Sequence, residues 1–227
     1  AQQKFDSAAY VQQFKKIFPA FALDTARQND ELSNEQKIEG LSKVWYEAKF
    51  NFANFDLVPQ LNWDSAYRAF IPRVLATHDI LSYYGELKKF NQLLHDGHSR
   101  VVEPLYYFMK KGMLPFVFEF LDGKVILSSV LSHDPEYTRA QIGWIATAIE
   151  GVPIQDYIKK TISPYLHFST PQDSISRIYR YELCAGKLTD KVSIRFITKE
   201  GKEKTLSFKR MKIDFDEDPV QFKLLPG

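Results

Sequence analysis

The spacing of apolar residues changes once along this chain, near Met113. Before that point apolar side chains recur every three or four positions, which places them on one face of a helix. The spacing is most regular in the set Ile38, Leu41, Trp45, Ala48 and Phe52. After Met113 the apolar segments are short and β-rich, which favours strands. We therefore expect an α+β protein in which a helical domain precedes a small β-rich domain.

The helical part contains signals for helices around residues 11–21, 34–52, 64–75 and 77–95. Ser33 and Gln36 have the spacing of a capping box, in which each side chain bonds the other residue's backbone N–H. Pro72 is expected to kink or shorten the third helix. In the fourth helix we expect Thr77 to cap the start and Gly97 to take the left-handed conformation that ends a helix.

Two hairpin signals dominate the β-rich part. In the first, strands flank Asp122-Gly123-Lys124, and in the second they flank a turn at 199–202. A further strand is expected at 144–149, and helices at 152–162 and 171–183. The last residues carry no closing element, so the expected domains are 1–103 (helical), 104–212 (β-rich) and 213–227 (a linker).

Composition and charge exclude several classes of protein. The hydrophobic fraction of 44% and the charged fraction of 26% are those of a folded chain. The net charge is +2, and Lys and Arg are interleaved with Asp and Glu, so we expect no nucleic-acid partner and no anionic membrane surface. No apolar run approaches the ~18 residues that a membrane span needs. The single cysteine, Cys184, excludes an internal disulfide and is expected to be a buried structural thiol.

Motifs that hold nucleotides, metals or a hydrolase nucleophile are absent from the sequence. It contains no P-loop, no Gly-x-Gly-x-x-Gly, no Cys-x-x-Cys pair and no Gly-x-Ser-x-Gly elbow. We therefore expect neither a cofactor nor a metal.

Asp96, His98 and Ser99 form the sharpest candidate site, because they follow the end of a predicted helix. Polar groups held at the end of a rigid element are well placed for chemistry. Histidine titrates near neutrality and is the commonest general base, which makes His98 the candidate catalytic residue. A loop histidine is more often a surface or structural residue, and Asp96 and Ser99 are then loop hydrogen-bonding residues.

The segment that leads into the first predicted strand is the second candidate. A glycine followed by apolar residues can present backbone N–H groups to a peptide carboxylate, while the adjacent strand edge pairs with the peptide. The candidate peptide-binding residues are Gly112, Met113, Leu114 and Phe116. The simpler interpretation is the ordinary start of a strand.

An aromatic cluster between Trp45 and Trp63 suggests a third, purely structural hypothesis, in which it forms an assembly surface. Core packing explains these side chains better, because Trp45 and Phe52 fall on the regular apolar stripe of their helix.

Several segments, in order along the chain, resemble the C-terminal processing serine proteases, and in particular their tricorn-type branch. Gly40–Phe52 is similar to the first helix signature of that branch, and Leu61–Asp64 and Leu93–Ser99 are similar to the segments that follow it. Residues 113–116 and 142–153 resemble the PDZ-like domain of the family, although glutamate at position 150 stands where asparagine is usual. The resemblance implies a helical N-terminal domain, then a PDZ-like domain with two helices, then a catalytic core.

The resemblance also implies a role for His98, because the histidine of the matching Gly-His-Ser/Thr segment belongs to the catalytic set of the tricorn branch. Other branches use a Ser-Lys dyad and do not need this histidine. The nucleophilic serine of the family lies beyond the PDZ-like domain, so the chain as given is expected to lack peptidase activity. Residues 213–227 would lead to that absent catalytic domain, and the expected partners are this domain and protein or peptide substrates.

The family resemblance and the start at Ala1-Gln2 predict an exported protein, periplasmic or extracellular. The same start is also explained as an arbitrary boundary. The alternative function is a peptide- or ligand-binding module with no protease role, because one scaffold can be reused for binding alone.

Overall fold

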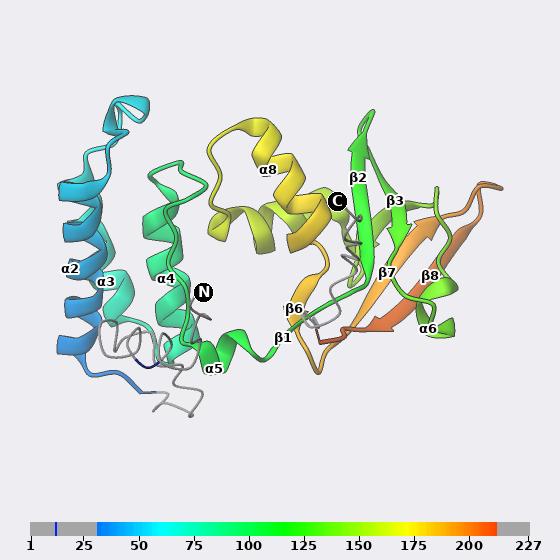
Figure 1. The fold of residues 1–227 in the computed structure, drawn as a ribbon, viewed down its shortest axis with the longest axis horizontal. Helices are drawn as coiled ribbons and strands as arrows, with labels where there is room; N and C mark the ends of the chain where they lie inside the picture. The colour runs from blue at the N-terminus through cyan, green and yellow to red at the C-terminus, as the bar shows by residue number, and fades with distance from the viewer. Residues whose placement is uncertain (1–11, 13–30, 213–227) are drawn as a thin grey trace, which may run out of the picture.

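The computed structural model describes residue 12 and residues 31–212. The helices α2 (Asn34–Asn51), α3 (Trp63–Leu75) and α4 (Ile80–Gln92) gather at one side of the molecule and the sheet lies at the other, with α8 (Pro171–Arg177) between them (Figure 1). The protein is α+β, as expected. Residue 12 apart, the helix expected around 11–21 lies outside the described residues, as does the linker expected at 213–227. The domain boundaries stay predictions.

The helical part consists of α2 (Asn34–Asn51), α3 (Trp63–Leu75) and α4 (Ile80–Gln92), with a 3-10 turn at Phe55–Leu57. The predicted capping box is confirmed. Gln36 N donates to Ser33 Oγ at 3.3 Å, and Ser33 N donates to Gln36 Oε1 at 2.9 Å. Pro72 lies in the last turn of α3, so the helix continues through it and ends at Leu75.

The start of α4 differs from the prediction. Asp79, not Thr77, is the capping residue, and its carboxylate accepts a hydrogen bond from Ser82 N at 2.8 Å. Thr77 is bound to the end of α3 instead, where its hydroxyl donates to the Val74 carbonyl at 2.6 Å. The prediction for Thr77 was wrong because this hydroxyl is already used by the preceding helix.

The end of α4 also differs. The helix stops at Gln92, and His95 takes the left-handed conformation with φ 49°. Gly97 is not among the residues with positive φ, so it does not end the helix as predicted. The left-handed residue lies two positions earlier than predicted, because α4 already ends at Gln92.

The aromatic cluster packs inside the helical part. Trp63 stacks on Phe90 with ring centroids 4.1 Å apart, and its Nε1 donates to the Trp45 carbonyl at 3.0 Å. The buried residues of this core are Leu41, Trp63, Phe70, Val74, Tyr83, Leu87, Phe90 and Leu94. Core packing therefore accounts for the cluster, apart from Phe50, which is exposed.

The sheet part is built on antiparallel strands in the order β2-β3-β4-β7-β8 (Figure 1). These strands span Phe116–Leu121, Lys124–Val130, Ile145–Ile149, Lys191–Ile197 and Glu203–Lys209, with the short β5 (Val152–Pro153) beside β4. Both predicted hairpins are confirmed. In the first, Leu121 pairs with Lys124, and Asp122 and Gly123 both have positive φ, as a two-residue turn of this kind requires.

Short helices surround the sheet. The chain enters this part through α5 (Leu105–Phe108) and β1 (Lys111–Met113), which pairs with β6 (Ala185–Lys187), and α6 spans Pro135–Thr138. The helix predicted at 152–162 is α7 (Ile154–Tyr157), extended by the π-helical η3 (Ile158–Ile162) and the 3-10 turn η4 (Ser163–Tyr165). It starts later than predicted because residues 152–153 form β5. The helix predicted at 171–183 is α8 (Pro171–Arg177), extended by the π-helical η5 (Ile178–Glu182).

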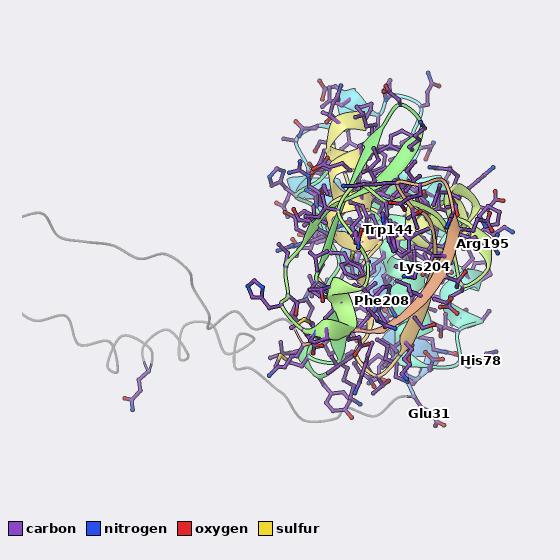
Figure 2. All side chains as sticks on the ribbon, turned by 90° about the vertical axis from the view of Figure 1, so that its right-hand side faces the viewer. Glu31, His78, Trp144, Arg195, Lys204 and Phe208 are labelled. Carbon is purple, nitrogen blue, oxygen red and sulfur yellow. The ribbon has the colours of Figure 1, made fainter. Side chains whose placement is uncertain are left out.

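Aromatic rings fill the core of the sheet part. Phe116 and Phe208 meet edge to face with centroids 4.9 Å apart. At the sheet surface, Lys204 Nζ lies 5.2 Å from the centroid of the Trp144 ring (Figure 2). Cys184 is fully buried, and this burial raises the pKa of its thiol to about 12. The prediction of a buried structural thiol is confirmed.

Within the described part of the chain, none of the helices combines the length and the apolar character that crossing a bilayer requires.

Candidate functional site

The loop that carries His98 is bound to the sheet part. Gly97 N donates to Ser169 Oγ at 2.8 Å, and the Gly97 carbonyl accepts from Arg177 Nη2 at 3.2 Å. Ser169 Oγ in turn donates to Asp96 Oδ1 at 3.3 Å. Ser169 lies just before α8 and Arg177 is its last residue, so both ends of this helix contribute to holding the loop.

Hydrogen bonds inside the loop add to its rigidity. Ser99 N donates to Asp96 Oδ2 at 2.7 Å, and Asn91 Nδ2 of α4 donates to the Ser99 carbonyl at 2.7 Å. Burial raises the pKa of Asp96, but hydrogen bonds from Ser99, from the His98 backbone and from Ser169 outweigh it and hold that pKa below its usual value. The predicted loop hydrogen bonding of Asp96 and Ser99 is confirmed.

His98 itself points to solvent. Its side chain is 95% exposed, and its Nδ1 lies 3.9 Å from Asp96 Oδ1, beyond hydrogen-bond distance. Among the described residues it hydrogen-bonds no hydroxyl or thiol. An imidazole in this position is accessible to a group from elsewhere in the protein, with a carboxylate nearby on the same loop.

The residues that grip the loop from the sheet part were not identified from the sequence. Arg177 uses all three of its nitrogens: Nε donates to Asp173 Oδ1 at 2.7 Å, Nη1 lies 3.0 Å from His167 Nε2, and Nη2 binds the Gly97 carbonyl. Burial, with the nearby charges of Arg177 and Arg100, lowers the pKa of His167. A neutral His167 ring can accept the Arg177 hydrogen bond. Ser169 and Arg177 lie 72 and 80 residues from Gly97 in the sequence, so no local pattern links them to the loop.

The candidate peptide-binding segment is already hydrogen-bonded within the chain. Met113 N donates to the Met211 carbonyl at 2.9 Å, and Leu114 N to the Cys184 carbonyl at 3.1 Å. Gly112 stands opposite Gly186 in the β1–β6 pair, and a side chain on it would meet the Leu188 backbone at 2.9 Å. Leu114 and Phe116 are buried in the core. The N–H groups of Met113 and Leu114, expected to hold a peptide carboxylate, thus have acceptors already.

The outer edge of β2 is covered by the helix that follows α8. The ring of Phe120 stacks on that of Tyr179 with centroids 4.9 Å apart and planes 3° from parallel. Beside this stack, Glu119 forms an ion pair with Arg180 at 2.6 Å. A peptide that adds to this edge would compete with the η5 side chains for contact with Phe120 and Glu119.

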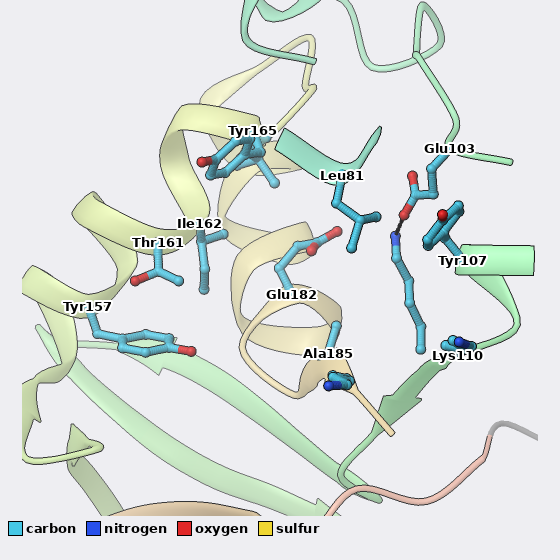
Figure 3. A pocket seen from close by; sticks show the side chains of 14 residues that line it. Leu81, Glu103, Tyr107, Lys110, Tyr157, Thr161, Ile162, Tyr165, Glu182 and Ala185 are labelled. Atoms are coloured by element: carbon cyan, nitrogen blue, oxygen red, sulfur yellow. Dashed lines mark ion pairs between the residues drawn. The ribbon is translucent and has the colours of Figure 1, made fainter. Parts of the chain in front are cut away.

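A cavity of about 390 Å³ lies between the helical part and the sheet part. Leu81, Ile162 and Tyr165 give it largely apolar and aromatic walls, and the Glu182 side chain points into it (Figure 3). Burial raises the pKa of the Glu182 carboxyl, although Lys111 and other cations oppose this. In residue 12 and residues 31–212, no three His, Cys, Asp or Glu side chains are grouped as a metal ion would require.

Glu103 joins the helical part and the sheet part at the edge of this cavity. Its buried carboxylate is ion-paired with Lys88 of α4 at 2.5 Å and with Lys111 of β1. Figure 3 shows the Glu103 side chain at the edge of the cavity. Burial alone would raise the pKa of Glu103, but the hydrogen bonds from Lys111 and Lys88 lower it to about 2. The carboxylate is therefore ionised at neutral pH and ties α4 to β1.

Comparison with known proteins identifies the fold. No family model matches the chain, and no curated protein matches its sequence. Solved structures do match. Mature CPAF aligns with a TM-score of 0.65 at 13% identity, over 80% of this chain and 35% of that chain, and CPAF complexed with lactacystin aligns with a TM-score of 0.66 over the same shares. The chain spans about a third of the length of CPAF.

The photosystem II D1 C-terminal processing protease also matches, with a TM-score of 0.40 at 12% identity, over 79% of this chain and 45% of that chain. A TM-score of 0.40 is too low to show a shared fold. The likeness to CPAF is closer, and at 13% identity it concerns the fold alone.

Proposed function

We propose that this chain is the N-terminal portion of an exported serine peptidase of the C-terminal processing type. In this proposal residues 1–103 supply His98 as the general base, residues 104–212 form a PDZ-like domain that binds protein or peptide substrates, and residues 213–227 lead to a catalytic domain. The observation that carries it is the exposed imidazole of His98 on a loop that is hydrogen-bonded to both the helical part and the sheet part.

The geometry around His98 suits a base that completes its site with another domain. A general base needs hydrogen-bond reach to the nucleophile, and its orientation is commonly set by a third group. Asp96 carries a carboxylate oxygen 3.9 Å from His98 Nδ1 on the same loop, and in this proposal it is the third group. The nucleophilic serine and the oxyanion donors would come from the catalytic domain, so the 227-residue chain alone is expected to be inactive.

The experiment compares histidine variants in the longest polypeptide that the gene encodes. His98→Ala should reduce kcat/KM on an unfolded protein substrate by roughly 10²–10⁴-fold, the usual contribution of a general base. His78→Ala is the matched control, because His78 is also exposed and lies outside the loop. Equal activity of wild type and His98→Ala would remove His98 from the mechanism.

A second candidate function is a peptide- or ligand-binding module without protease activity. The cavity between the helical part and the sheet part favours it, because its largely apolar and aromatic walls, with the Glu182 carboxylate pointing inward, resemble a binding pocket more than a reaction site. This function predicts that the full-length protein binds peptides and hydrolyses none. Hydrolysis that depends on His98 would exclude it.

A further inference from the structure

We infer that Ser169 and Arg177 are positioning residues for His98: the PDZ-like part holds the histidine loop in place through α8. The expected effect of these residues on catalysis rests on the proposed function. Their effect on the position of the loop does not, and it is measurable without any peptidase activity.

The contacts converge on the residue immediately before His98. Ser169 Oγ accepts from Gly97 N at 2.8 Å, and Arg177 Nη2 donates to the Gly97 carbonyl at 3.2 Å. That carbonyl belongs to the peptide unit that joins Gly97 to His98. Arg177 therefore holds the peptide plane from which the histidine extends, and Ser169 holds the plane before it.

Gly97 allows this close approach. A Cβ at this position would lie 2.8 Å from Asp173 Oδ2, 3.0 Å from Arg177 Nη2 and 3.2 Å from Ser169 Oγ. The backbone of Gly97 does not need glycine for its conformation, because its φ is not positive. Glycine at this position leaves room for the loop to pack directly against α8, where any side chain would collide.

The α8 side of the contact is held by hydrogen bonds of its own. Thr170 Oγ1 accepts from Asp173 N at 3.1 Å, and Asp173 Oδ2 accepts from Ser169 N at 3.2 Å. Asp173 and His167 then fix the Arg177 guanidinium through its other two nitrogens. A planar guanidinium with three partners has one orientation, which lysine cannot reproduce.

The decisive experiment follows His98 and Gly97 by NMR in the 227-residue chain, with Ser169→Ala and Arg177→Gln as the test variants. Ser169 is exposed, so its loss of one hydroxyl leaves the core intact and keeps the test valid if Arg177→Gln fails to fold. Arg180→Gln is the matched control, because Arg180 lies on the same helical segment and binds Glu119 rather than the loop. Ser169→Thr is the rescue variant, since it restores the hydroxyl.

The inference predicts that Ser169→Ala and Arg177→Gln shift the His98 imidazole signals and speed hydrogen exchange of the Gly97 amide by roughly tenfold, the equivalent of 1.4 kcal/mol. Ser169→Thr and Arg180→Gln should match wild type. Unmoved His98 signals in both test variants would overturn it.

In the full-length peptidase the test variants should lower kcat with little change in KM. A shifted imidazole in a protein whose His98→Ala variant stays active would instead retain the positioning and refute the proposed function.

Discussion

The carbonyl oxygen of Gly97 accepts a hydrogen bond from Arg177 Nη2 at 3.2 Å, across 80 residues of sequence. This bond lies immediately before the candidate base in the sequence, and it joins the helical part to the sheet part. The position of His98 therefore depends on how the helical part and the sheet part dock, and not on its own loop alone.

Gly97→Ala should loosen the docking of the helical part on the sheet part. The added Cβ would lie 2.8 Å from the Asp173 carboxylate, so the loop or α8 must move. Overpacking of this kind costs about 1–3 kcal/mol of unfolding free energy. Gly85→Ala is the control: its Cβ makes only an ordinary 3.5 Å contact, and alanine favours helix α4. Urea unfolding of both variants checks the prediction, which fails if Gly97→Ala is as stable as Gly85→Ala.

Glu103 should make stability depend on acid. Its folded-state pKa of about 2 lies below the ordinary value of 4.5, so its contribution is complete above about pH 5 and is lost as the pH falls toward 2. We expect Glu103→Gln to be about 2 kcal/mol less stable than wild type at pH 7, after allowance for solvent screening of the pair. The gap should close near pH 2. Denaturant unfolding of both proteins between pH 2 and 7 measures it, and a gap independent of pH contradicts the account.

Peptide binding at β2 should improve when the cover on its edge is weakened. Phe120→Ala removes the stack on Tyr179, which is worth about 0.5–1.5 kcal/mol, so affinity for a pool of C-terminal peptides should rise roughly two- to tenfold. Leu121→Ala is the control, because Leu121 is exposed at the end of the same strand. Fluorescence anisotropy gives the affinities. Unchanged affinity in Phe120→Ala would place the peptide site elsewhere, and weaker binding would mean that Phe120 supports the peptide instead of covering the edge.

Cys184 should be chemically inert in the folded protein. Burial raises the pKa of its thiol to about 12, so the reactive thiolate is scarce at pH 8. Iodoacetamide is expected to label it only after unfolding in urea, as mass spectrometry would show. Rapid labelling of the native chain would mean that this region of the core opens.

Local features of the fold could be predicted from the sequence, because their physics is local. Ser33 and Gln36 lie three residues apart and form the expected capping box. Two flanking strands and Asp122-Gly123 were sufficient for the first hairpin. Thr77 was misassigned because a hydroxyl between two helices can serve either one, and only the packed structure shows that it binds α3.

The candidate site was predicted only incompletely, because its partners are distant in sequence. His98 was identified from its loop and from a family resemblance, but nothing local to Ser169 or Arg177 indicates that they bind Gly97. The glycine itself was noticed for the wrong reason, as a left-handed helix end. The internal acceptors of Met113 and Leu114 also come from segments about 70 to 100 residues away, so pattern alone did not show that these amides are occupied.

Whether His98 activates a serine can be tested with a mechanism-based probe, without knowledge of the substrate. The measurement is the rate at which a fluorophosphonate labels the full-length protein, compared among wild type, His98→Ala and His78→Ala. The account predicts one labelled serine in wild type, an equal rate in His78→Ala and a rate at least roughly 100-fold slower in His98→Ala. Labelling of His98→Ala at the wild-type rate would contradict it.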